Sequence, residues 1–402
     1  MFINCYDFND LISPLSKEEF LQEYWEKKPL VLTSRGVKGY KPILSLEEIE
    51  SLISNYAPSP EKIPWIRFVK NKNELSIEDY LIKLDWGYHP ASIVDAEKVL
   101  NGYSNGNTII LNFLDRRWEP IRRLSEMLTD VLGYPAGANA YLTPPRAQGF
   151  PAHYDMQDVF ILQLEGKKLW KLYENYFPFP IKGLTETKPV EPGPLLCEVN
   201  LCPGDLLYIP RGWVHEALTG ETYSLHLTAG IYPLTWGNLF SELLNEMPEF
   251  RRSIPKKVLH SKGEEIPWLD YLKELQRGCE ETANWEKALD RIKQKMFAKR
   301  VKPFHFGLAA EINLEKMNEE TLFKKKEGVA PVIQTEELET TIAIGEKVIS
   351  GPAYMEPVLE AMMAKSSFSA KTLPDALSLS GKMNLIRLLV RARFLEVASA
   401  EG

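Results

Sequence analysis

The sequence predicts an α+β protein of two or three domains with a β-barrel at its centre. At 402 residues the chain is too long for one ordinary domain. From about 136 to 236, short apolar strands alternate with Gly, Pro and Asn turns, as in an all-β barrel or sandwich. Helical patterns follow, and then a mixture of a hairpin and helices. The predicted domains are therefore 1–236, with its barrel core at about 136–236, then 237–304 and 305–402.

The N-terminal part contains helices with recognisable start signals. Ser16 and Glu19 form a capping-box pattern in SKEEFLQEYWEKKPLVL, which ends in an apolar strand after Pro29. Another helix is expected from Ser45, and a longer one in EPIRRLSEMLTDVLG, closed by Gly133. Between residues 60 and 115 we expect strands in PWIRFVK and TIILNFL and a helix in SIEDYLIKL.

The barrel strands and the following helices are read from their periodicities. The expected strands are NAYLTP, DVFILQLEG, KKLWKLY, LCEVNL, DLLYIP and YSLHLTAGIYP. The expected helices are NLFSELLNEMPEF, WLDYLKELQRGCEE and WEKALDRIKQKMFAKR. This helical region is interpreted either as a dimerisation element or as a layer that packs on the barrel, and the sequence favours neither.

The C-terminal segment has the element order of a winged-helix-like module. We expect a helix in LEKMNEETLF, a hairpin in ETTIAIGEKVISGP and helices in YMEPVLEAMMA and KMNLIRLLVRARFLEVA. Residues 305–402 hold more Asp and Glu than Lys and Arg. Direct DNA binding is therefore not expected, and a protein-contact or architectural role is favoured.

Composition excludes several classes of protein. Hydrophobic residues make up 44% and charged residues 26%, as in soluble globular proteins, and no apolar stretch is long enough to span a membrane. MFINCYDFND lacks the features of a signal peptide, so we expect a cytoplasmic protein. Four scattered cysteines predict no disulfide framework. The net charge of -7 argues against sequence-independent binding to nucleic acid and suits a basic protein partner.

His153, Asp155 and His215 are the candidate metal ligands. Side chains at i and i+2 of an extended strand share a face, so His153 and Asp155 can bind one ion together. A histidine from a neighbouring strand would complete a set of two imidazoles and one carboxylate. That set is typical of non-haem Fe(II) oxygenases, because it leaves coordination positions open for a cosubstrate and dioxygen.

The residues around His215 support this interpretation. Gly204 to His215 follow the spacing G-x5-P-x-G-x2-H. The spacing resembles the second motif of the cupin superfamily, whose histidine ligates metal inside a small β-barrel. The alternative, a metal-free barrel with ordinary core histidines, stays open.

Lys168 is a candidate anion-binding residue. It follows the Glu165-Gly166 turn at the start of the strand KKLWKLY. An ammonium that points into the barrel needs an anionic partner, and the distal carboxylate of 2-oxoglutarate would be one. An exposed hairpin lysine is equally compatible with the sequence.

Longer stretches resemble the JmjC-type, 2-oxoglutarate-dependent ribosomal oxygenases of the cupin superfamily. The resembling stretches are EEFLQEYWEKKPLVL, NAYLTPPRAQGFPAHYDMQDVFILQLEGKKLWKLY, PGDLLYIPRGWVHEA and SLHLTAGIYPLTWGNL. The resemblance implies a double-stranded β-helix, a helical dimerisation region and a C-terminal winged helix, the last by architecture alone. It also implies an Fe(II)-dependent protein hydroxylase that acts on a ribosomal protein.

The resemblance further implies roles for individual residues. His153, Asp155 and His215 match the iron ligands, and Lys168 matches the residue that pairs with 2-oxoglutarate. The remaining matches are Asn139 beside the cosubstrate, Tyr141 on the substrate side, and His226 and Thr228 in the pocket wall. No catalytic side chain is expected beyond the metal centre.

Three functions are weighed. The first is a hydroxylase of a ribosomal protein. The second is a JmjC-type oxygenase that acts on a small molecule or a tRNA base. The third is a non-catalytic cupin that serves as a binding module. Formation of succinate from 2-oxoglutarate would separate the first two from the third.

Overall fold

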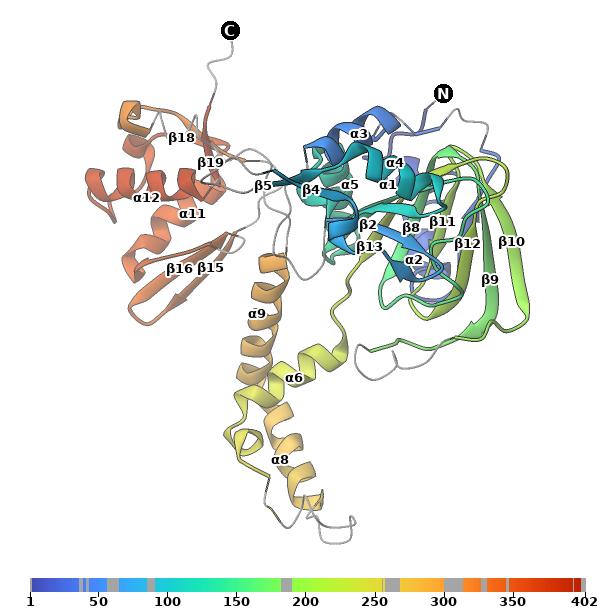
Figure 1. The fold of residues 1–402 in the computed structure, drawn as a ribbon. Helices are drawn as coiled ribbons and strands as arrows, with labels where there is room; N and C mark the ends of the chain where they lie inside the picture. Colours follow the sequence, from blue (N-terminus) through green and yellow to red (C-terminus); the bar gives the residue numbers. More distant parts are fainter. Residues whose placement is uncertain are drawn as a thin grey trace. The chain divides into compact units, whose positions relative to one another are not determined.

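The computed structural model describes residues 2–35, 39–40, 43–55, 65–84, 91–181, 190–254, 256, 268–299, 314–326, 331–344, 347–392 and 394–398. The chain divides into two compact units, residues 1–233 and 234–402 (Figure 1). Among the described residues, no helix is both long and apolar enough to cross a bilayer. The division of the second unit into a helical region and a C-terminal module remains a prediction.

The helices of the first unit begin where the sequence supplies N-caps. Ser16 and Ser45 both form capping boxes, with Glu19 and Glu48 respectively. The helices are α1 (Phe8–Ile12), α2 (Lys17–Glu23), α3 (Leu46–Ser54), α4 (Ala96–Ser104) and α5 (Glu119–Leu132), with 3-10 turns η1 (Ile77–Asp79) and η2 (Leu114–Arg116). α5 ends at Gly133, which has a φ of 78° and adopts the left-handed conformation that a side chain disfavours.

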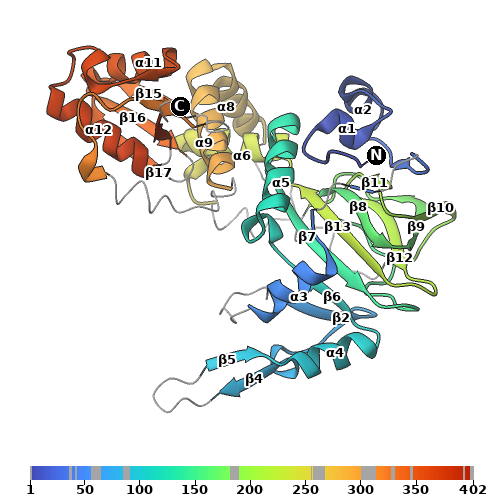
Figure 2. The same cartoon turned by 90° about the horizontal axis from the view of Figure 1, so that it is seen from above.

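Two sheets form the barrel (Figure 2). The large sheet has the strand order β1-β11-β8-β13-β7-β6-β2-β3. Its strands are β1 (Leu30–Leu32), β2 (Ile66–Lys70), β3 (Asn73–Glu74), β6 (Thr108–Leu111), β7 (Ala136–Thr143), β8 (Asp158–Gly166), β11 (Leu206–Ile209) and β13 (Ser224–Ile231). The small sheet is β10 (Leu195–Leu201), β9 (Lys168–Tyr176) and β12 (Trp213–Leu218). A separate hairpin joins β4 (Leu81–Leu84) and β5 (Ala91–Val94).

The strands β8, β11 and β13 of the large sheet are largely buried on both faces, which explains their apolar composition. On the outer face, Phe20 of α2 packs edge-on against Tyr208, with ring centroids 4.9 Å apart. On the inner face, a second cluster fills the space between the sheets. Its buried members are Val159, Ile161, Trp170, Leu172, Leu201, Leu207 and Ile209.

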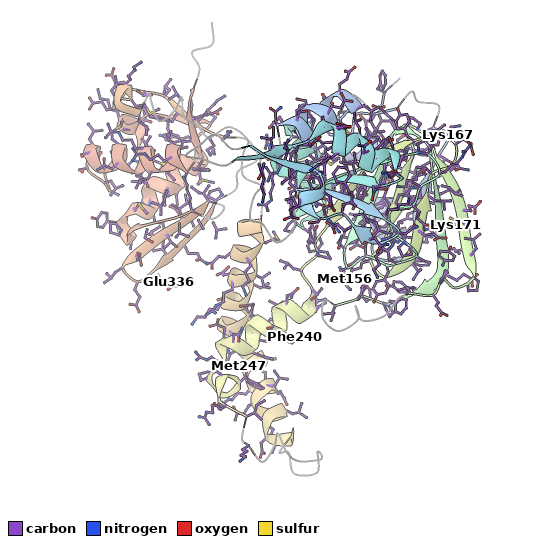
Figure 3. All side chains as sticks on the ribbon, viewed as in Figure 1. Met156, Lys167, Lys171, Phe240, Met247 and Glu336 are labelled. Atoms are coloured by element: carbon purple, nitrogen blue, oxygen red, sulfur yellow. The ribbon has the colours of Figure 1, made fainter. Side chains whose placement is uncertain are left out.

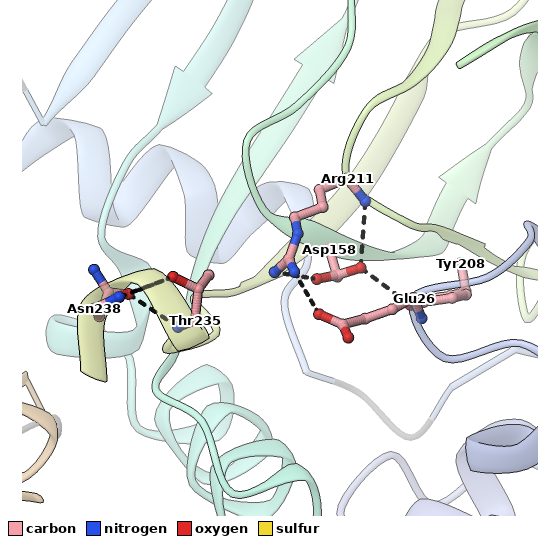
Figure 4. Close-up of polar contacts among 6 residues, drawn as sticks. All are labelled: Glu26, Asp158, Tyr208, Arg211, Thr235 and Asn238. Atoms are coloured by element: carbon pink, nitrogen blue, oxygen red, sulfur yellow. Dashed lines mark hydrogen bonds and ion pairs between the residues drawn. The ribbon is translucent and has the colours of Figure 1, made fainter. Parts of the chain in front are cut away.

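Three helices open the second unit: α6 (Trp236–Glu246), α8 (Trp268–Glu280) and α9 (Thr282–Lys299), with a 3-10 turn η3 (Pro248–Arg251) after α6. Phe240 of α6, labelled in Figure 3, packs edge-on against Trp285 of α9 at 5.5 Å. A capping box starts α6: the Asn238 N–H donates to Thr235 Oγ1 at 3.2 Å, and the Thr235 N–H donates to Asn238 Oδ1 at 2.9 Å (Figure 4).

The C-terminal residues form their own core. The strands are β14 (Phe323–Lys325), β15 (Val332–Glu336), β16 (Glu339–Ile344), β17 (Lys347–Pro352), β18 (Ser367–Phe368) and β19 (Leu395–Val397). The helices are α11 (Glu356–Ala364) and α12 (Leu379–Arg391), with 3-10 turns η4 (Leu314–Lys316), η5 (Ala353–Met355) and η6 (Ala370–Thr372). β16 and β17 pair as the expected antiparallel hairpin, and α11 confirms the first helix that follows. The second is confirmed only as far as Arg391, because Leu395–Val397, expected to be helical, form β19 and pair with β14.

Two expected helices are wrong. SIEDYLIKL forms the short turn η1 and then β4, which pairs with β5. LEKMNEETLF forms only the turn η4 and a coil that leads into β14. In both segments the residues follow a helical pattern but pair with a strand elsewhere in the chain. The sequence of the segment alone does not reveal that partner.

Candidate metal centre and cosubstrate pocket

The three predicted metal ligands lie together. The ligand atoms of His153, Asp155 and His215 are all within 4.8 Å of one another. His215 lies on β12, a strand that the sequence analysis did not list. His153 and Asp155 lie in the segment that leads into β8 and not inside a regular strand, although His153 forms an isolated bridge with His215.

Main-chain hydrogen bonds hold the two ligand-bearing segments together. The His153 N–H donates to the His215 carbonyl at 3.0 Å, and the His215 N–H donates to the His153 carbonyl at 2.8 Å. The Gly212 N–H donates to the Asp155 carbonyl at 3.0 Å. The ligands are therefore held by backbone pairing between residues about sixty positions apart in sequence.

Both imidazoles are oriented for metal binding. Nδ1 of His153 lies 2.8 Å from the Pro151 carbonyl, and Nδ1 of His215 lies 2.9 Å from the Trp213 carbonyl. A carbonyl only accepts hydrogen bonds, so each Nδ1 carries a proton, and Nε2 is the ring nitrogen left to ligate a metal. Nε2 of His215 is 3.6 Å from Asp155 Oδ2.

The protonation state of His215 suits this role. Burial, and secondarily the neighbouring His153, lowers the pKa of His215 to about 4, so its imidazole is neutral at physiological pH. The imidazoles of His153 and His215 and the carboxylate of Asp155 match the donor set of a non-haem Fe(II) site, and the residues fit that ion.

Lys168 points into the barrel, which decides between the two alternatives that the sequence left open. Its side chain donates to Thr143 Oγ1 at 2.9 Å, and the residue is only 5% exposed. The neighbouring Lys167, labelled in Figure 3, is exposed. Burial lowers the pKa of Lys168 to about 7, and no carboxylate of the described residues forms an ion pair with it. Within the described part of the chain, the barrel thus holds a lysine whose charge has no anionic partner.

The four other candidate residues form one wall of the interior. β7 and β13 pair His226 with Tyr141 and Thr228 with Asn139, and these residues share a face because they alternate along each strand. Tyr141 stacks on His226 with ring centroids 4.8 Å apart. Nδ1 of His226 is buried and has no hydrogen-bond partner among the residues that the structure describes. Burial, and secondarily Lys168, lowers the pKa of His226 well below its usual value.

Asn139 accepts a hydrogen bond from the Phe113 N–H at 3.0 Å. Phe113 has a φ of 56°, which is uncommon for a bulky residue. Burial raises the pKa of Tyr141 to about 12, and the charge of Asp155 adds to this effect. Tyr141 is therefore a neutral hydroxyl within electrostatic reach of the metal ligands.

Two site residues were missed from the sequence. Trp170 lies against both His226 and His215, with ring centroids 5.5 and 6.0 Å apart, and its buried indole N–H has no partner among the described residues. Thr143 accepts the Lys168 hydrogen bond. Strand alternation was the available signal, because Trp170 lies two residues after Lys168 and Thr143 two after Tyr141.

Residues 113–239 match the family model described as the JmjC domain. The bifunctional lysine-specific demethylase and histidyl-hydroxylase NO66 of Drosophila pseudoobscura is 30% identical over 264 residues, which cover 63% of this chain and 27% of that protein. Ribosomal oxygenase 2 of Rattus norvegicus is 32% identical over 275 residues, which cover 63% and 55% respectively. The chain therefore spans from about a quarter to about half of these relatives.

The crystal structure of the Escherichia coli ribosomal oxygenase YcfD resembles this one with a TM-score of 0.55 and 17% identity. The likeness covers 96% of this chain and 98% of that chain, and it shows a shared fold. Another structure of YcfD is a complex with cobalt and 2-oxoglutarate.

Proposed function

We propose that the protein is an Fe(II)- and 2-oxoglutarate-dependent oxygenase that hydroxylates a side chain of a ribosomal protein, since residues 113–239 match the JmjC domain model. One observation carries the proposal. Two Nε2 atoms and one carboxylate converge in the same barrel that buries Lys168, a cation with no described anionic partner.

His153, Asp155 and His215 would hold Fe(II) through Nε2, carboxylate and Nε2. With iron bound, oxidative decarboxylation of 2-oxoglutarate to succinate and carbon dioxide drives insertion of one oxygen atom from dioxygen into a C–H bond. The protein contributes orientation and exclusion of water. No side chain acts as a general base at the carbon, so the catalytic set does not extend beyond the metal centre.

Lys168 would bind the distal carboxylate of 2-oxoglutarate by a charge-assisted hydrogen bond. Thr143 accepts a hydrogen bond from the ammonium and so fixes its position. Asn139, His226 and Thr228 would line the cosubstrate, and the unpartnered Nδ1 of His226 is available to it. The complex of the E. coli relative with cobalt and 2-oxoglutarate supports this assignment.

The substrate assignment rests on the relatives and on charge. Two of the similar proteins are named ribosomal oxygenases, and the net charge of -7 favours encounter with a basic ribosomal protein. Tyr141 would contact the substrate, since its hydroxyl lies near Asp155. We place the protein in the cytoplasm. The alternatives are a small-molecule or tRNA substrate, and a non-catalytic cupin.

We also propose a homodimer formed through residues 237–304, with residues 305–402 as a winged-helix-like domain that does not bind DNA directly. Large apolar side chains that stay exposed on the three helices support the dimer. They are Trp236, Phe240, Leu272 and Leu289.

The test measures the two expected products, succinate and a ribosomal protein that carries one added oxygen atom. The purified protein with Fe(II) should convert 2-oxoglutarate to succinate, and ribosomal proteins from cells lacking the gene should miss the mass of one oxygen atom on one protein. Unchanged masses together with succinate formation would favour a small-molecule or tRNA substrate. Absence of succinate under all conditions would favour the non-catalytic alternative.

A further inference from the structure

A buried ion pair joins Asp158, three residues after Asp155, to Arg211, four residues before His215 (Figure 4). Asp158, which is fully buried, is the first residue of β8, and Arg211, which is 7% exposed, lies in the turn between β11 and β12. Arg211 Nη1 is 3.6 Å from Asp158 Oδ2, and the Arg211 main-chain N–H donates to Asp158 Oδ1 at 3.2 Å. Arg211 is thus held to one carboxylate by both its backbone and its side chain.

Two further residues complete the network. The Tyr208 hydroxyl donates to Asp158 Oδ1 at 3.2 Å and accepts from the Glu26 N–H at 3.0 Å. Glu26 Oε1 is 2.6 Å from Arg211 Nη2 on the outer, partly exposed side. The Phe179 ring lies 5.1 Å from the guanidinium carbon. The charges are enclosed by protein on several sides, so solvent screens them little.

The ion pair connects the two segments that carry the metal ligands. Asp158 ends the segment that contains His153 and Asp155, and Arg211 precedes Gly212, whose N–H donates to the Asp155 carbonyl. Arg211 also stands four residues before His215. Glu26, by contrast, belongs to the loop after α2 and carries no ligand.

We propose that Asp158 and Arg211 are positioning residues for the metal centre: their ion pair sets the spacing between the His153–Asp155 segment and the β12 segment, and metal affinity depends on it. The inference rests on the proposed metal site. Neither residue is a ligand, and the effect passes through the Gly212 contact and the backbone bridge between the two histidines.

The experiment measures the dissociation constant of the full-length protein for Mn(II) by electron paramagnetic resonance, and its Co(II) absorption spectrum. Asp158→Asn keeps a side-chain oxygen for Tyr208 and for the Arg211 N–H but removes the charge. We expect it to weaken Mn(II) binding about 10- to 100-fold and to alter the Co(II) bands. Glu26→Gln is the matched control, since it removes the other carboxylate from the same guanidinium and should leave both readouts unchanged.

Arg211→Lys provides a second route should Asp158→Asn not fold, because a lysine keeps the charge but loses the planar fork that spans two carboxylates. It should also weaken Mn(II) binding. Unchanged affinity in the folded Asp158 or Arg211 variant would overturn the inference, and so would an equal loss in Glu26→Gln. Failure of the unsubstituted protein to bind any divalent metal would instead contradict the proposed function, and this inference with it.

Discussion

At the scale of single residues, burial sets the charge states on which the site depends. His215 is neutral because desolvation disfavours its imidazolium, and a neutral imidazole is the form that binds metal. Burial acts on Lys168 in the same direction and lowers its pKa to about 7. Burial therefore keeps His215 in the neutral form that can bind a metal. The same burial leaves the charge of Lys168 to be stabilised by a bound anion.

The first prediction concerns Asp155. Asp155→Ala removes the one anionic ligand, so the protein should lose bound iron and all 2-oxoglutarate turnover. Its circular dichroism spectrum should stay that of the parent, because the backbone bonds of this segment do not involve the carboxylate. Iron content by atomic absorption is the measurement, and a variant that keeps full iron and activity would refute the ligand assignment.

The second prediction concerns Lys168 and pH. A bound carboxylate raises the pKa of the ammonium, so above about pH 7 binding of 2-oxoglutarate takes up a proton. The affinity should fall as pH rises from 7 to 9, by up to about tenfold per unit. Calorimetry on the Mn(II)-loaded protein, in buffers of different ionisation enthalpy, measures both the affinity and the proton uptake.

Lys168→Arg is the control for this titration, since a guanidinium stays charged throughout and removes the pH dependence that comes from this residue. Lys168→Ala should weaken binding about ten- to a hundredfold at pH 7. Equal affinity of the unsubstituted protein at pH 7 and pH 9 would point to another anchor for the cosubstrate.

At the scale of elements, the turn between β11 and β12 determines where His215 lies. Gly212 in this turn has a φ of 89°, and a Cβ there would lie 1.9 Å from the Phe177 carbonyl oxygen. Only glycine fits both the backbone conformation and the close approach. The glycine of the G-x2-H pattern is therefore a steric requirement of this turn.

The third prediction compares two glycines. Gly212→Ala should lower the free energy of unfolding by more than about 2 kcal/mol. The cost of placing alanine at a left-handed φ adds to the cost of the clash between its Cβ and the Phe177 carbonyl. Gly133→Ala, at a φ of 78° with nothing within 4 Å, should cost only about 1 kcal/mol. Urea denaturation measures both, and equal losses would mean that the turn relaxes around the added methyl group.

At the scale of the whole molecule, the fourth prediction is the homodimer. Leu272 of α8 is 58% exposed and Leu100 of α4, in the first unit, is 63% exposed. Leu272→Glu should shift the protein toward monomer, because it places a charge in an apolar interface, and Leu100→Glu should not. Light scattering at micromolar concentration decides, and an unsubstituted protein that is already monomeric contradicts the dimer.

The fifth prediction follows from the overall charge. Association with a basic ribosomal protein should slow as salt rises, because screening shortens the reach of the attraction between unlike charges. Stopped-flow measurement of the association rate at salt concentrations from about 50 to about 500 mM would give this salt dependence. A small neutral substrate would give rates that do not depend on salt.

The sequence by itself determined the features that depend on neighbouring residues. Capping boxes at Ser16 and Ser45 mark the starts of α2 and α3, and the strand pattern in DVFILQLEG predicts β8. The sequence also singled out the candidate metal ligands, since His153 and Asp155 stand two positions apart and His215 closes a motif of fixed spacing. For the caps and the strand the physical cause lies within a few residues of the chain, whereas the meeting of His215 with His153 and Asp155 depends on backbone pairing between distant segments.

Only the tertiary structure decided the features that depend on distant residues. In the structure, β1, β2, β3 and β6 belong to the same sheet as the barrel strands, and Lys168 points into the barrel. Asp158 and Arg211, about fifty positions apart, form an ion pair. A turn and a strand also replace the expected helix at 76–84. The free energies of strand pairing, desolvation and ion pairing depend on groups that are distant in sequence and that the fold brings close. A local sequence pattern does not contain those groups.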